Sequence, residues 1–314
     1  MKSLRYVALA VCLSVASVGA HAQQFINILT GGTSGVYYPM GVALSQIYEK
    51  TIPNAKIAVQ STKASAENVN LIQAGRGELA FALADTVSAA WQGNVEVGFK
   101  TKLDKLRGIA GIYSNYIQIV ASADSGIKTL ADLKGKRVSV GAARSGTELN
   151  ARAVLKAAGL TYADLAKVEY MGFGESVELM KNRQLDATLQ SAGLGVASIR
   201  DLANSVPIVL IPVPESVVAK INDPAYISGV IPAGTYQGQT QAIPTATIPN
   251  VLVTNMNVSN EVAYEMTKSL FTHLPQLVAA HSAAKGIVPA NGPKTPVPLH
   301  PGAIKYYKEA GLMK

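Results

Sequence analysis

The chain has 314 residues, a formal net charge of +8 and a hydrophobic content of 48%. This length allows one large or two ordinary domains. The basic residues are scattered and do not alternate with aromatic residues, so we expect no nucleic-acid-binding surface.

The N-terminal segment has the features of a secretory signal peptide. Lys2 and Arg5 precede an apolar run over residues 6–18, and residues 20–22 form a small-x-small cleavage site. We therefore expect cleavage after Ala22 and a periplasmic location. No later apolar run reaches the ~20 residues that a membrane span needs, so we expect a soluble mature protein.

The mature chain would contain no cysteine and would be less basic than the precursor. Removing Lys2 and Arg5 from the 28 basic residues leaves 26, against 20 acidic residues, a formal charge of +6 that favours anionic partners. Cys12 offers an alternative, lipidation, but Val11 is a poor residue before an acceptor cysteine.

Residues 25–39 predict a strand, a loop rich in Gly, Ser and Thr, and a helix start. Phe25–Leu29 is a short apolar run, typical of an inner strand of a parallel sheet. Pro39 fits the first helical position, where its missing N–H costs nothing. Unpaired N–H groups at such a helix start attract a carboxylate or phosphate. The loop matches neither the dinucleotide fingerprint nor a P-loop, so nucleotide binding is not expected.

Strand-like runs alternate with helical patterns along most of the chain. Further strands are expected at residues 57–60, 79–83, 117–121, 137–140, 187–190 and 208–211. Such alternation predicts α/β architecture with parallel sheets. Ser65 predicts the start of a helix that Gly75 or Gly77 ends.

A second strand, loop and helix module begins at Arg137. Its strand leads into Ser145 and a helix that Gly159 ends. We expect the turn at 124–126 to be the first crossing between two lobes and residues 232–246 to contain the second. Lobe 1 would then contain residues 23–122 and 243–314, and lobe 2 residues 123–242. Two modules that each present a helix N-terminus predict a ligand cleft between the lobes.

The C-terminal part is expected to return the chain to lobe 1. Residues 246–253 predict a strand, and residues 260–280 predict one long helix. The proline-rich tail at 288–301 cannot be regular structure and is expected to wrap lobe 1.

The predicted cleft residues come from both lobes. They are Gly32, Thr33, Ser34, Tyr37, Ser65 and Asp85 in lobe 1, and Arg144, Ser145, Gly146, Thr147, Gln190 and Ser191 in lobe 2. We expect hydroxyl and N–H groups at the helix starts to bind an anion. The planar guanidinium group of Arg144 has the geometry to donate two hydrogen bonds to a carboxylate. Ser65 and Thr147 have the alternative role of helix N-caps, and Asp85 that of a strand end or cap. We predict a small organic anion with at least one carboxylate as the ligand.

A secreted enzyme is the main alternative class. The mature chain has three histidines: His273 and His281 lie eight apart on one predicted helix, and His300 lies in the tail. This spacing suits no metal site, and we expect no cofactor. Ser34 lacks the G-x-S-x-G setting of a hydrolase nucleophile. We therefore predict a monomeric binding protein without catalytic residues.

Four motifs, which span nearly the whole mature chain, resemble those of one protein family. They are GGTSGVYYP at 31–39, DLKGKRV at 132–138, SGTE at 145–148 and PLHPGA at 298–303. In this order they are similar to the TAXI family of solute receptors, the binding components of TRAP transporters. The resemblance implies the type II periplasmic binding protein fold, with two α/β lobes, two crossover segments and closure around a small solute.

The resemblance also implies a partner and a ligand class. The partner is a TRAP membrane permease driven by an ion gradient, and the ligands are glutamate-like or 2-oxoglutarate-like acids. The binding component of an ABC importer is the alternative. Where the family often has Gly-Gly-Ser, this chain has Lys63-Ala64-Ser65, so Lys63 either adds a positive charge near the cleft or points to solvent.

Overall fold

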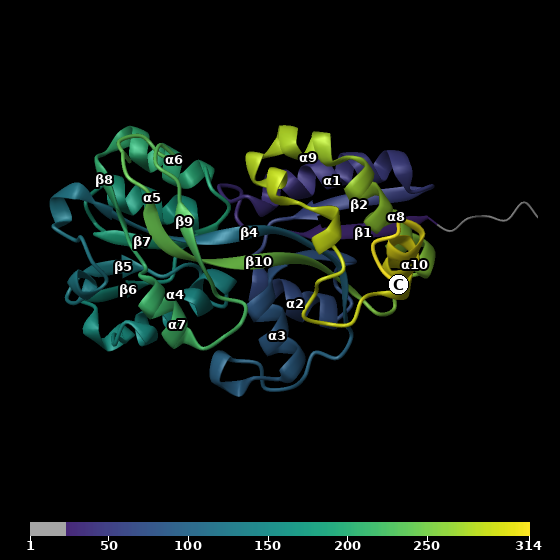
Figure 1. Ribbon diagram of the computed structural model, residues 1–314, viewed down its shortest axis with the longest axis horizontal. Coiled ribbons are helices and arrows are strands. Elements are labelled where there is room, and N and C mark those ends of the chain that lie inside the picture. Colours follow the sequence, from purple (N-terminus) through teal and green to yellow (C-terminus); the bar gives the residue numbers. More distant parts are fainter. Residues whose placement is uncertain (1–22) are drawn as a thin grey trace, which may run out of the picture.

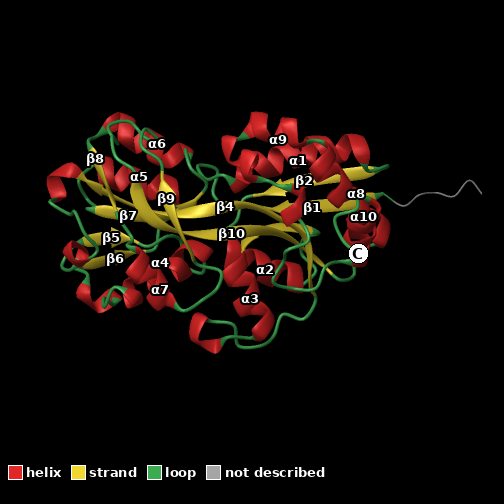
Figure 2. Ribbon diagram, in the orientation of Figure 1, coloured by secondary structure: helices red, strands yellow, loops and turns green. Residues whose placement is uncertain are grey.

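A computed structural model describes residues 23–314, so the predicted signal peptide lies outside the described residues. The fold consists of two α/β lobes joined by two long strands that run through both (Figure 1). Helices cover both faces of the strands in each lobe (Figure 2).

Lobe 1 contains three parallel strands in the order β2-β1-β3. These are β1 (Gln24–Leu29), β2 (Ala55–Gln60) and β3 (Leu79–Leu83), followed by α1 (Tyr37–Thr51), α2 (Ser65–Gln73) and α3 (Ala84–Gln92) respectively. The strand β3 is buried along its whole length, as its unbroken apolar run predicts. Pro39 is the third residue of α1 and not the first as predicted. Proline is tolerated at this position because the N–H groups of the whole first turn lack intrahelical acceptors.

Lobe 2 repeats this arrangement with parallel strands in the order β7-β5-β6. These are β5 (Arg137–Ser139), β6 (Lys167–Glu169) and β7 (Ala187–Ala192), followed by α4 (Gly146–Ala157), α5 (Phe173–Lys181) and α6 (Ala197–Ser205) respectively. The lobe is completed by β8 (Ile208–Ile211), α7 (Glu215–Ile221) and β9 (Ile227–Ile231).

The two connecting strands, β4 (Leu106–Ser122) and β10 (Ile243–Asn255), make the sheet mixed and not purely parallel as predicted. Residues 250–253 of β10 pair antiparallel with β3 in lobe 1, and residues 243–247 pair with β9 in lobe 2. β4 pairs with β10 up to Tyr116 and with β7 from Tyr116 onward. The turn at 124–126 therefore follows a strand that has already paired within lobe 2. The lobe limits at 122/123 and 242/243 stay predictions.

The C-terminal segment packs on lobe 1. The predicted single helix is two helices, α8 (Asn260–Thr272) and α9 (Leu274–Ala280), because Pro275 has no N–H to continue the helical hydrogen bonding. Beyond them the proline-rich tail lies along β4, where Gly111 N donates to Gly292 O at 2.7 Å and Gly108 N donates to Pro298 O at 2.9 Å. The chain ends with α10 (Pro301–Glu309).

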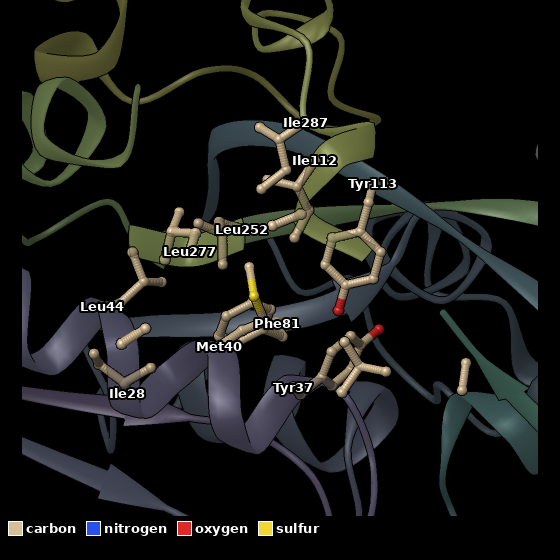
Figure 3. Close-up of a cluster of buried hydrophobic side chains, with 14 of the residues drawn as sticks. Ile28, Tyr37, Met40, Leu44, Phe81, Ile112, Tyr113, Leu252, Leu277 and Ile287 are labelled. Carbon is tan, nitrogen blue, oxygen red and sulfur yellow. The ribbon is translucent and has the colours of Figure 1, made fainter. Parts of the chain in front are cut away.

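The largest cluster of buried apolar side chains lies under α1. Met40 and Leu44 of α1 belong to it together with Leu277 of α9 (Figure 3). At the start of α1, the Tyr37 ring stacks on Phe81 of β3 with centroids 5.1 Å apart. This packing holds the end of α1 that faces lobe 2.

Candidate functional site

A cavity of about 490 Å³ lies between the lobes, within the size range of about 300–1,000 Å³ typical of small-molecule sites. It is lined by Gly31, Gly32, Thr33, Ser34, Gly35, Val36, Tyr37, Ser61, Thr62, Lys63, Ala64, Ser65 and Leu83 from lobe 1, by Asn115 of β4, and by Ala142, Ala143, Ser145, Thr147, Tyr170, Gly172, Phe173, Gly174, Glu175, Ser191 and Ala192 from lobe 2. Both predicted Gly/Ser/Thr loops thus face the same cavity.

Four helices begin at this cavity. The lining residues Tyr37, Ser65 and Phe173 are the first residues of α1, α2 and α5, and Ser145 is the N-cap of α4. Each helix start carries unpaired N–H groups and the positive end of a helix dipole. Their convergence favours an anion in the cavity, although the described lining contains no buried cation.

The start of α4 is held by a side-chain cap. Ser145 Oγ accepts a hydrogen bond from Glu148 N at 3.0 Å, so Ser145 and not Thr147 is the N-cap. Thr147 lines the cavity in the first turn of the helix. Glu148 points elsewhere, since its carboxylate pairs with Arg152 at 2.6 Å.

Ser65 ties α2 to the neighbouring strand. Its Oγ accepts from Leu83 N at 3.1 Å, at the end of β3, and the N-cap position of α2 is occupied by Ala64. The alternative role of Ser65 as an N-cap is therefore not realised. The hydroxyl instead holds the helix start against the strand end that lines the cavity.

A chain of buried hydrogen bonds runs beneath the cavity and joins the lobes. Tyr37 Oη donates to Asn250 Oδ1 of β10, and Asn250 Nδ2 donates to Asn115 Oδ1 of β4 at 2.7 Å. Asn115 Nδ2 in turn donates to the carbonyl oxygen of Ser191 on β7 at 2.8 Å. Burial raises the pKa of Tyr37 above its ordinary value, so the phenol stays a neutral donor.

Ser191 offers an unused hydrogen-bonding group. Its side chain is 5% exposed, its Oγ has no hydrogen-bond partner within the described protein, and the residue lines the cavity. Buried polar groups almost always have partners. Because the residue lines the cavity, this Oγ is the polar atom that a rotation of the side chain would offer to a bound molecule.

Four predicted site residues do not line the cavity. Asp85 is turned into an interface between the lobes, where its Oδ2 accepts from Asn150 Nδ2 at 2.7 Å and from Tyr226 Oη at 2.8 Å. Burial raises the pKa of Asp85 to about 6. Gln190 points to the opposite side of β7 from Ser191, with its Oε1 accepting from Ser198 Oγ at 2.6 Å.

Arg144 and Gly146 flank the cavity without lining it. Arg144 is exposed, at a φ of +61° that turns the loop before α4. Gly146 contacts lobe 1 so closely that a Cβ there would lie 2.6 Å from Ser65 Oγ. The other eight predicted residues all line the cavity, and so does Lys63.

Several lining residues were not predicted. Tyr170, Phe173 and Glu175 follow β6, and their position after a parallel strand, at the start of a helix, is the same signal that identified the two loops. The sequence indicates less strongly that Asn115 belongs to the site, because it is only a polar residue next to an apolar run.

The histidines lie away from the cavity. His281 Nδ1 accepts from Ala283 N at 3.1 Å, and His300 Nδ1 accepts from Gly302 N at 3.2 Å at the start of α10. Burial lowers the pKa of both rings. Within residues 23–314, no group of three or more His, Cys, Asp or Glu side chains has a metal-binding arrangement. In the same part of the chain, no helix has the length and apolar character that crossing a bilayer requires.

Solved structures with the same fold include a periplasmic binding protein and two proteins with a small bound solute. The periplasmic binding protein BugD is 13% identical over 93% of this chain and 99% of its own, with a TM-score of 0.59. PhnD1 from Prochlorococcus marinus, in complex with methylphosphonate, is 11% identical over 83% of this chain and 91% of its own (TM-score 0.57). An ancestral arginine-binding protein bound to arginine is 15% identical over 85% of this chain and 100% of its own (TM-score 0.53). These similarities confirm the predicted type II periplasmic binding protein fold.

The sequence match to a protein family covers nearly the whole described chain. Residues 28–311 match the NMT1-like family, from the first strand of lobe 1 to the end of the C-terminal helix. The protein therefore belongs to the NMT1-like family.

Proposed function

We propose that this protein is an extracytoplasmic solute receptor that captures a small organic anion between its lobes. One observation supports this most strongly: four helix N-termini meet at a cavity lined by Ser191, whose buried Oγ has no hydrogen-bond partner among the described residues. Free N–H groups and an unpaired hydroxyl together suit an anionic group with several acceptor positions.

The ligand carries at least one carboxylate, held by neutral donors. All buried residues of the cavity lining are uncharged, and its two charged residues, Lys63 and Glu175, are exposed. The eight predicted residues that line the cavity are the proposed ligand contacts. The motif resemblance narrows the ligand to glutamate-like or 2-oxoglutarate-like acids, and PhnD1 and the arginine-binding protein are structures of this fold with small charged solutes.

The protein binds its ligand without transforming it. No histidine or cysteine is among the cavity-lining residues, and Asp85, the strongest candidate for a buried acid, has its carboxylate engaged outside the cavity. The carboxylate of the lining, Glu175, is exposed and accepts a hydrogen bond from Gly172 N. General acid-base or nucleophilic chemistry would need such a group within reach of the ligand. A secreted enzyme acting on a small carboxylate is the less supported alternative.

The receptor works in the periplasm as a monomer, after removal of residues 1–22, and delivers its ligand to a membrane permease. The motif resemblance supports a TRAP permease driven by an ion gradient, and an ABC importer is the alternative. Uptake of the radiolabelled ligand by cells distinguishes them: collapse of the ion gradients at maintained ATP stops TRAP transport and spares ATP-driven import.

A thermal-shift panel tests the ligand class. The protein is unfolded and refolded to strip bound solute, then heated with glutamate, glutamine, 2-oxoglutarate, succinate, pyruvate or a neutral sugar. A ligand at about a hundred times its Kd raises the free energy of unfolding by about 2.7 kcal/mol, which is enough to give a clear rise in Tm. A shift with the sugar and none with any acid at millimolar concentration would overturn the carboxylate assignment.

A further inference from the structure

We infer that Lys63 is the residue by which this receptor selects a ligand with a second anionic group, so that the preferred ligand is a dianion such as a dicarboxylate. The inference rests on the proposed function, because it concerns the same cavity.

Lys63 is the only basic residue of the cavity lining. It lies in the loop between β2 and α2 and is exposed, whereas Ser65, two residues later, is buried in the same lining. None of the ion pairs among the described residues involves Lys63. Its ammonium group therefore has no carboxylate partner among the described residues that would compete with an anionic ligand.

The backbone around Lys63 is held in place before any ligand binds. Lys63 N donates to Glu67 Oε2 at 2.6 Å, and Ala64 N donates to Thr62 Oγ1 at 2.9 Å. Ala64 has a φ of +69° and a ψ of −146°, a conformation that strongly favours glycine. A strained residue persists only where its surroundings enforce it, so Lys63 extends from a fixed turn at the cavity mouth.

The distribution of charge explains why a second anionic group needs Lys63. Inside the cavity, neutral donors and helix N-termini suffice for one carboxylate. A second carboxylate would have no neutralising partner there, and burying an unpaired charge is costly. The mouth of the cavity also holds Glu175, whose Oε2 accepts from Gly172 N at 3.0 Å and which repels anions. Lys63 offsets this repulsion and pairs with the outer carboxylate.

The test compares acids with their monoamides, which have nearly the same shape and one charge less. Calorimetric titration of the wild type and K63Q uses three pairs: glutamate and glutamine, succinate and succinamate, and glutarate and glutaramate. The wild type is expected to prefer the acid of the pair that binds. K63Q is expected to lower this preference by roughly two- to fivefold, the range for an exposed ion pair, and to leave the amide affinity unchanged.

Two variants complete the design. K56Q removes an exposed lysine of β2 that does not line the cavity, changes the net charge by the same amount, and is expected to keep the wild-type preference. E175Q removes the repelling carboxylate and is expected to raise the preference for the acid.

The outcomes separate the inference from the proposed function. If the wild type binds the amide of each pair as tightly as the acid, the preference for a second anionic group is overturned and the proposed function stands. If it binds an acid but K63Q keeps the wild-type preference, or weakens acid and amide equally, the role of Lys63 alone is overturned. Equal Tm values for unliganded wild type and K63Q establish that the variant is folded.

Discussion

The hydroxyl of Tyr37, at the first residue of α1, donates a hydrogen bond to Asn250 Oδ1 in the middle of β10. Both side chains are buried, and Asn250 is the first residue of β10 that pairs with β3 in lobe 1, after the part at 243–247 that pairs in lobe 2. The ligand loop of lobe 1 is thereby attached to the strand that connects the lobes.

Tyr37→Phe is expected to destabilise the protein by about 1–3 kcal/mol, because it leaves the buried Asn250 Oδ1 without a donor. Urea unfolding measures the effect. Tyr38→Phe is the matched control: Tyr38 is the next residue, is half-buried, and lies outside the cavity lining. Equal losses in the two variants would contradict a specific contribution of the Tyr37 hydroxyl.

Ser191→Ala is expected to weaken ligand binding by roughly two- to tenfold, the value of one hydrogen bond, with almost no change in the Tm of the unliganded protein. The reason is that Ser191 Oγ has no hydrogen-bond partner within the described protein. Its removal therefore breaks no hydrogen bond inside the protein and affects only the contact with the ligand. Calorimetric titration and thermal unfolding measure the two quantities. An unchanged Kd would exclude Ser191 from the site.

Gly146→Ala is expected to lower ligand affinity by tenfold or more, because a Cβ would lie 2.6 Å from Ser65 Oγ and 2.7 Å from Leu83 Cδ1 and would keep the lobes apart. Gly174→Ala is the control, since it also adds a methyl group in the first turn of a helix between the lobes. Its Cβ would lie 3.4 Å from Ser34 Oγ, an ordinary contact. Equal affinities of the two variants would argue against a tight closure contact at Gly146.

Ligand binding is expected to reduce the radius of gyration in small-angle X-ray scattering. The cavity is lined from both lobes, so a solute touches both only when they approach, which is hinge motion. From the sequence, the crossings between the lobes are expected at the turn 124–126 and within residues 232–246. The strand pairings favour positions near Tyr116 of β4 and between Thr247 and Asn250 of β10. Equal radii with and without saturating ligand would exclude closure.

Asp85 is expected to make stability fall as pH rises from about 4 to about 6. Its pKa is about 6 in the folded protein and 3.8 as the model-peptide value, so the folded state binds more protons across this window. The free energy of unfolding decreases by on the order of 3 kcal/mol across this window, and Asp85 causes no further decrease above pH 6. Urea unfolding of the wild type and Asp85→Asn at several pH values measures it. The same pH slope in both proteins would exclude Asp85 as the cause.

The sequence by itself determined the elements whose signals are local. β3 and β8 have the predicted limits, and α4 starts after Ser145 and ends before Gly159, which has a φ of +80°. Apolar runs, capping hydroxyls and left-handed glycines act within a few residues, so they can be read without knowing the fold. The same holds for the two loops, because a parallel strand that leads into a helix presents its loop at one edge of the sheet.

Only the tertiary structure decided the length of β4 and the direction of the polar side chains. Gly111 interrupts the apolar pattern of β4 because the tail packs against it: a Cβ there would lie 2.7 Å from the carbonyl oxygen of Asn291, distant in sequence. Asp85 and Ser191 both lie at strand ends and look equally suited to a ligand. Packing turns Asp85 toward Asn150 and leaves Ser191 Oγ unpaired at the cavity, because a buried polar group takes whichever partner the assembled lobes bring within reach.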